Sequence, residues 1–140
     1  MNIPVGRKRS AIFKTMEQSI AEAVCRMATE YYRLRTVSML DLTKSSGYLQ
    51  DPDAVTEEAL EEVLRANPEL ISSWLNLSDA RTRYGWCLSK PHGVGYEGDG
   101  WVVEYPNGKK KRHFPDGFTA CAFYVKQEIE CYRELISDAS

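Results

Sequence analysis

Residues 101–114 read WVVEYPNGKKKRHF, and together with residues 84–90, YGWCLSK, they decide the fold that the sequence predicts. In the earlier segment large apolar residues alternate with small or polar ones, which is the period of a half-buried strand. The later segment opens with aromatic and β-branched residues, which suit a pleated surface. A Pro-Asn-Gly turn interrupts it, and a basic segment follows. We therefore expect three antiparallel strands, at about residues 84–90, 100–105 and 109–114.

The turn at residues 106–108 sets the register of the last two strands. A two-residue turn would need a backbone N–H at position 106, which proline lacks. A three-residue loop avoids this difficulty, because Gly108 then takes the left-handed position of a bulge. This loop pairs Tyr105 with Lys109. The residues that it places on one face of the hairpin are Trp101, Val103, Tyr105, Lys109, Lys111 and His113.

Apolar residues at helical spacing flank the predicted sheet on both sides in the sequence. They predict helices at about residues 11–36, 56–66, 68–77 and 117–136, with Ser10, Thr56 and Asp116 as N-caps. Residues 41–53 are rich in Ser, Thr, Gly and Pro and predict a loop. The expected architecture is an α+β domain in which the first and last helices back the sheet. We expect residues 1–9 to form a flexible basic tail and residues 10–140 a single domain.

Length, charge and cysteine content narrow the classes of protein to consider. A chain of 140 residues suits one domain. A net charge of −2 and a pI of about 5.7 argue against a general polyanion binder, so nucleic-acid binding would need a local basic patch. The four cysteines form no CxxC pair, which favours reduced thiols in a cytoplasmic protein. We expect no membrane span, no metal and no cofactor.

Charge is segregated along the chain. The predicted helix at 56–66 and its neighbours carry Asp51, Asp53, Glu57, Glu58, Glu61, Glu62 and Glu69 against Arg65 alone. The hairpin at 101–114 is basic. Three interpretations remain open: the acidic face is only solvated, the helix and the hairpin attract each other within the fold, or one of them recognises a charged partner. A fourth concerns the hairpin alone, since charges on an edge strand prevent unwanted strand pairing.

Two patterns suggest chemistry, and neither is complete. Residues 93–98 match the spacing of a dinucleotide-binding loop, but a strand follows them where that loop needs a helix. Cys87 with His92 or His113 could form a nucleophile pair, yet no spacing brings them together. The carboxylates in the acidic helix have no nearby histidine. The sequence therefore predicts a protein that is not an enzyme.

The function that these patterns favour is a non-enzymatic protein-binding module, for which a small inhibitor or immunity-type protein is the specific hypothesis. The alternative is a nucleic-acid-binding or regulatory protein that uses the basic hairpin. A small enzyme with a Cys/His site is a third reading. Aromatic and basic residues of the hairpin supply the residue types of binding hot spots. The predicted contact residues are Tyr96, Trp101, Tyr105, Lys109, Lys111, Arg112 and His113 in the hairpin, and Glu58 and Glu62 in the acidic helix.

Overall fold

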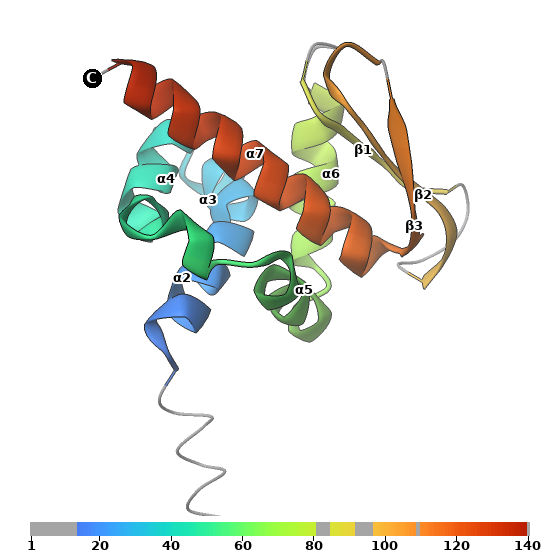
Figure 1. The fold of residues 1–140 in the computed structure, drawn as a ribbon, viewed down its shortest axis with the longest axis horizontal. Coiled ribbons are helices and arrows are strands. Elements are labelled where there is room, and N and C mark those ends of the chain that lie inside the picture. The colour runs from blue at the N-terminus through green and yellow to red at the C-terminus, as the bar shows by residue number, and fades with distance from the viewer. Residues whose placement is uncertain (1–13, 81–84, 92–96, 109, 140) are drawn as a thin grey trace, which may run out of the picture.

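The computed structural model describes residues 14–80, 85–91, 97–108 and 110–139. It has the predicted α+β architecture, an antiparallel three-stranded sheet with helices (Figure 1). The elements follow in the order α2 (Met16–Cys25), α3 (Met27–Leu34), α4 (Met39–Ser46), α5 (Glu57–Ala66), α6 (Leu70–Ala80), β1 (Cys87–Ser89), β2 (Glu97–Glu104), β3 (Lys111–Asp116) and α7 (Gly117–Ala139). Short 3₁₀ helices lie at Tyr48–Gln50, Pro52–Ala54 and Pro106–Gly108.

Helix α7 is the element that joins the sheet to the other helices. It runs diagonally across the molecule, with the sheet at one end and α4 near the other (Figure 1). Leu88, Trp101, Val103 and Phe114 are buried on the face of the sheet that α7 covers. Helices α2 and α3 pack mainly against α5 and α6. The prediction that the last helix backs the sheet is confirmed, whereas the first helical segment backs other helices instead.

The predicted long helix at 11–36 is divided into α2 and α3. Thr15 caps helix α2: its hydroxyl accepts from the Gln18 N–H at 3.0 Å, and the Gln18 side chain accepts from the Thr15 N–H at 2.8 Å. This reciprocal capping box satisfies two amide groups that a helix N-terminus leaves without partners. Arg26 separates the two helices, and α3 ends where Arg35 takes a left-handed φ of 65°. The predicted cap Ser10 lies outside the described residues.

Helix α4 occupies part of the segment 41–53 that the sequence predicted as a loop. Ser38 caps it, accepting from the Asp41 N–H at 3.0 Å. Hydroxyl groups usually compete with helical hydrogen bonds, but here they bond back to carbonyls of the preceding turn, as the Thr43 hydroxyl does with the Met39 carbonyl at 2.8 Å. Thr43 is fully buried. Tertiary burial therefore outweighs the loop composition, and the loop prediction is wrong for this part.

The predicted hairpin register is wrong by one residue. The Tyr105 N–H donates to the Lys110 carbonyl at 2.8 Å, so the loop has four residues instead of three. Trp101 consequently pairs with Phe114, and Glu104 with Lys111. The extra residue fits because Asn107, like Gly108, adopts positive φ, at 70° and 64°. A one-residue shift exchanges the two faces of a strand.

The new register changes which basic residues lie beside the core. Arg112, opposite Val103, joins the face that α7 covers. Lys111 and His113, opposite Glu104 and Val102, lie on the outer face. This is the reverse of the predicted arrangement.

A polar cluster attaches the middle of α7 to the segment between α4 and α5. The Lys126 ammonium group donates to the Tyr48 hydroxyl at 2.8 Å and to the carbonyls of Pro52 and Val55 at 3.0 and 2.8 Å. The Tyr48 hydroxyl in turn donates to Glu130. Desolvation lowers the pKa of Lys126, and Glu130 opposes this effect. The cluster fixes the position of α7, on which both the sheet and α5 pack.

Candidate binding surface at the free edge of the sheet

The two edge strands of the sheet differ, because a helix covers one edge and the other edge is open. The candidate site lies at the open edge. Strand β1 lies beside α6, whose Ser78 hydroxyl accepts from the Leu88 N–H at 2.8 Å and donates to the Leu88 carbonyl at 3.4 Å. One hydroxyl thus takes the place of a neighbouring strand for both backbone groups of Leu88. The edge of β1 is closed at this point.

The outer edge of β3 is open. In an antiparallel pair, residues that exchange hydrogen bonds alternate with residues whose backbone groups point away from the partner strand. The Tyr105 N–H bonds the Lys110 carbonyl, so every second pair from there exchanges hydrogen bonds. These pairs are Val103 with Arg112 and Trp101 with Phe114. The N–H and C=O groups of Lys111 and His113 therefore point away from β2. Both residues are exposed, as is Pro115 at the end of the same edge.

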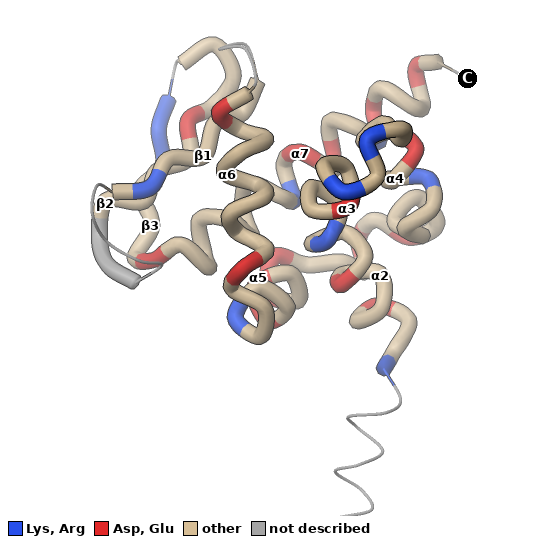
Figure 2. Tube along the Cα trace, turned by 180° about the vertical axis from the view of Figure 1, so that it is seen from behind, with Lys and Arg blue, Asp and Glu red and all other residues tan. Residues whose placement is uncertain are grey.

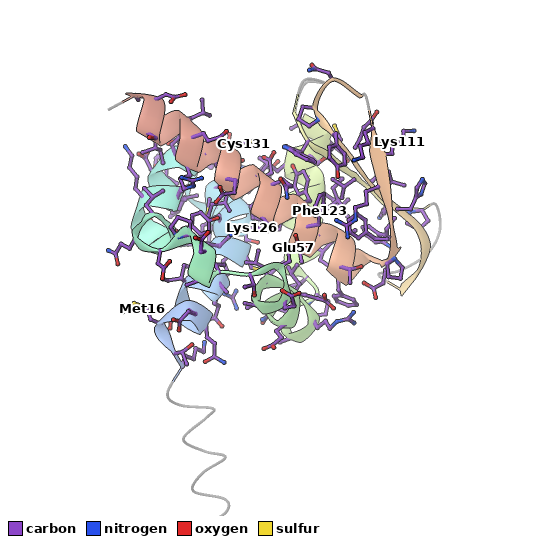
Figure 3. The ribbon with its side chains drawn as sticks, viewed as in Figure 1. Met16, Glu57, Lys111, Phe123, Lys126 and Cys131 are labelled. Atoms are coloured by element: carbon purple, nitrogen blue, oxygen red, sulfur yellow. The ribbon has the colours of Figure 1, made fainter. Side chains whose placement is uncertain are left out.

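A pocket of about 240 Å³ lies along this open edge, between β3, α5 and α7. Helix α5 contributes three carboxylates, those of Glu57, Glu58 and Glu61. Strand β3 contributes Arg112, His113, Phe114 and Pro115, and α7 contributes Thr119 and Ala122. Figure 2 shows acidic positions on α5, and Figure 3 labels Glu57 on α5 and Lys111 on β3. The acidic helix and the basic strand, separated in sequence, thus form opposite walls of one groove, which we call the β3–α5 groove.

Asp116 and Arg65 hold the two walls together. Asp116 ends β3 and caps α7, accepting from the Thr119 N–H at 2.9 Å, and it binds the Arg65 guanidinium at 3.1 Å. Arg65 also binds Glu61 at 2.8 Å and lies 4.6 Å from the centroid of the Phe118 ring. Burial tends to raise the pKa of Asp116, but the Thr119 N–H and Arg65 outweigh it and hold the pKa below its usual value. The carboxylate therefore stays ionised and anchors α5 to the hairpin.

Arg112 and Lys110 of the hairpin lie over aromatic rings. The Arg112 guanidinium is 4.9 Å from the centroid of the Phe114 ring and 4.8 Å from that of Phe123 on α7. Figure 3 labels Phe123 between α7 and β3. The Lys110 ammonium is 4.9 Å from the centroid of Tyr105. These contacts orient positive charge at the surface while the stems of the side chains cover the core.

The predicted contact residues separate into three groups in the structure. Lys111, Arg112 and His113 are exposed on β3, and Tyr105 is half-buried against Trp86, with ring centroids 4.6 Å apart. Glu58 is exposed on the rim of the β3–α5 groove. Glu62 is exposed too, but it lines a different groove of about 480 Å³ between α2 and α5, which Glu58 also borders. Tyr96 and Lys109 lie outside the described residues.

Trp101 is the predicted contact residue that the structure removes from the surface. Its side chain is 0% exposed and packs against Gly117 at the start of α7. The expectation of an exposed Trp101 is wrong because α7 covers this face of the sheet. Sequence reasoning also missed Phe123, which was not among the apolar residues used to predict the last helix, and it named Glu57 and Glu61 without placing them at a site.

The structure does not bring Cys87 and His113 together as the nucleophile pair considered from the sequence. Both residues lie on the outer face, but on the two outer strands and two positions apart along them, so their Cα atoms are about 12 Å apart at ordinary strand spacing. Burial and the nearby Glu104 raise the pKa of the Cys87 thiol, which therefore stays protonated at neutral pH. His92 lies outside the described residues. In the part of the chain that the structure describes, no three His, Cys, Asp or Glu residues come together as a metal site.

Comparison of the chain with protein-family models, with curated proteins and with solved structures gave no match. Among the described helices, each is too short or too polar to cross a lipid bilayer.

Proposed function

We propose that this protein is a non-enzymatic protein-binding module that engages its partner along the open edge of β3 and the β3–α5 groove. The single observation that supports this best is the exposed edge of β3 beside a pocket with charged walls. An open strand edge is a template for pairing with another chain, and proteins commonly close it. Here β1 is closed by Ser78, whereas β3 is open beside a preformed groove.

The specific form of this proposal is a small inhibitor or immunity-type protein, which blocks its partner by occupying one of the partner's surfaces. Rigid presentation favours such a role, because binding then orders few side chains. Arg65 and Asp116 fix the groove walls, and the aromatic rings fix Arg112. We place the protein in the cytoplasm on the ground that all four of its cysteines are free thiols.

Nucleic-acid binding is the second candidate, and the arrangement of charge disfavours it. Lys110, Lys111 and Arg112 could neutralise phosphates, but the carboxylates of Glu57, Glu58 and Glu61 line the same groove as Arg112. A phosphate backbone lying along β3 would approach these carboxylates. The groove suits a partner that offers both signs of charge.

The test is an affinity capture from lysate of the source organism, with and without nuclease, followed by quantitative mass spectrometry. The bait is compared with the double variant Lys111→Glu/Arg112→Glu and with Lys44→Glu, which reverses an exposed charge on the distant helix α4. We expect one protein to be recovered by the wild type and by Lys44→Glu, with or without nuclease, and at least about tenfold less by the double variant. Equal recovery by all baits, or loss of recovery after nuclease treatment, would contradict the proposal.

A further inference from the structure

We propose that the partner binds as an extended segment that adds a fourth strand to the sheet at β3, with basic side chains entering the β3–α5 groove and acidic side chains on the outer face. This inference deepens the proposed function and rests on it. It specifies the conformation of the bound segment and the order of its charges, neither of which follows from protein binding alone.

The backbone of β3 supplies the pairing groups. The N–H and C=O groups of Lys111 and His113 point outward, and no hydrogen bond between described residues uses them. A strand added at this edge gains four main-chain hydrogen bonds, which is how β-augmentation provides affinity. Pro115, next on the same edge, has no N–H to offer. The paired segment is therefore short, and pairing cannot extend along the edge into α7.

The lining of the β3–α5 groove determines which side-chain types the added strand can carry on its inner face. Alternate side chains of that strand point toward the side of the sheet where α5 and α7 lie. There they meet the carboxylates of Glu57, Glu58 and Glu61 on α5, which outnumber the guanidinium of Arg112 in the lining of the groove and leave it acidic on balance. The apolar Phe114 and Ala122 lie alongside. A long basic side chain satisfies both features, because its stem contacts the apolar groups and its charged end reaches the carboxylates. A helix pairs its own backbone groups, whereas an extended segment leaves its N–H and C=O groups free to pair with β3.

The residues on the outer face of β3 determine which side-chain types suit the outer face of the added strand. Lys111 points to this face beside His113, so residues of an added strand next to the Lys111 ammonium gain from being acidic. The same charge argues against a second copy of this chain as the occupant. Pairing β3 with another β3 would bring the two copies of Lys111 onto neighbouring strands of one face, and like charges on neighbouring strands are unfavourable. The partner is thus a different protein that carries an extended segment with basic and acidic residues in alternation.

The test begins with random 12-residue peptides displayed on phage and selected against the full chain. We expect selected peptides to alternate basic or long-stemmed residues with acidic ones. In a synthetic copy of the best peptide, methylation of successive backbone nitrogens should weaken binding at every second position, because only alternate N–H groups face β3. Sensitivity without this period of two, or a helical spacing of the selected residues, would overturn the inference.

Two variants at one position provide the matched comparison on the protein side. His113→Pro removes an outward N–H without touching the ladder to β2, whereas His113→Thr removes the imidazole and keeps the N–H. We expect the peptide to bind His113→Pro at least about tenfold more weakly than His113→Thr. Equal affinities for the two folded variants would overturn the inference. The methylation series uses only the wild-type protein, so the test stands even when His113→Pro does not fold.

The outcomes separate this inference from the proposed function. If affinity capture recovers a partner that depends on Lys111 and Arg112, while no selected peptide shows the two-residue period, the extended-strand inference is wrong and the proposed function stands. If capture shows no such dependence, the proposed function is wrong, and the inference is wrong with it.

Discussion

Replacing Gly117 with alanine tests the contact that positions the sheet on α7. A Cβ atom at position 117 would lie 2.6, 2.8 and 2.9 Å from the Cζ2, Cε2 and Cη2 atoms of the Trp101 ring. Carbon atoms in contact are ordinarily about 3.5–4.0 Å apart. The indole is fully buried, so α7 and β2 must separate by about 1 Å to admit the methyl group.

The expected cost follows from two opposing effects. Overpacking a core costs about 1–3 kcal/mol, and the better helix propensity of alanine returns at most about 1 kcal/mol. We therefore expect Gly117→Ala to lower the free energy of unfolding by about 1–2 kcal/mol. For a chain of 140 residues this corresponds to a decrease in Tm of roughly 3–7 °C.

The assay is urea unfolding followed by tryptophan fluorescence, with calorimetry for Tm. Gly85→Ala is the matched control, because a Cβ at position 85 would have no heavy atom within 4 Å. The control should change the free energy of unfolding by less than about 0.5 kcal/mol. A Gly117→Ala protein as stable as the wild type, or more stable, would refute the packing of α7 on Trp101.

Three further predictions concern the interior and its charges. Lys126→Met should lower the free energy of unfolding by about 2–3 kcal/mol in urea titrations, because two backbone carbonyls lose a charged donor; a loss below about 1 kcal/mol would contradict this. Burial raises the pKa of Cys25 to about 12 and that of Cys121 well above its usual value, so both thiols should resist a thiol reagent at pH 8 until denaturant is added. Arg133 lowers the pKa of Glu130 below its usual value of 4.5. The ionised Glu130 therefore stabilises the fold above that pH, and this stabilisation is lost as the pH falls through the folded-state pKa. On acidification from pH 5 to pH 3, Glu130→Gln should lose less stability than the wild type.

Local signals in the sequence predicted most of the helices correctly. Thr56 was predicted as the cap of α5, and its hydroxyl accepts from the Ala59 N–H at 3.1 Å. Asp116 was predicted as the cap of α7, and it fills that role. Such signals are readable because a cap and its partner lie within four residues of each other. The segment of α4 carries the same signal at Ser38, but the loop prediction rested on the serines, threonines, glycine and proline of residues 41–53 and did not use it.

The hairpin register could not be obtained in the same way. It depends on whether Asn107 adopts a left-handed conformation, which asparagine tolerates but does not require. Burial decides between the two loops: the observed register places Phe114 opposite Trp101 on the covered face. The predicted register would have placed His113 there. The identity of the buried partner is a property of the whole fold, since α7 provides the cover.

The sequence predicted the charges of the candidate site, but it did not predict the shape of the groove. Segregation of acidic and basic residues was visible in the sequence, and one of the open interpretations was attraction between the helix and the hairpin. The structure brings these elements to one groove, through the ion pair of Arg65 with Asp116. Nothing in the sequence indicated that Arg65, the single cation of the acidic segment, forms this link.

Hydrogen exchange of individual backbone amides, measured by NMR in the free protein and in its complex with the captured partner, tests the central claim most directly. Because the amides of Lys111 and His113 point away from β2, they should exchange rapidly in the free protein, while the Arg112 amide, bonded to β2, is protected. Binding should slow exchange at Lys111 and His113 by at least about tenfold. Unchanged exchange at these two amides in a saturated complex would contradict the claim that the partner binds along the open edge of β3.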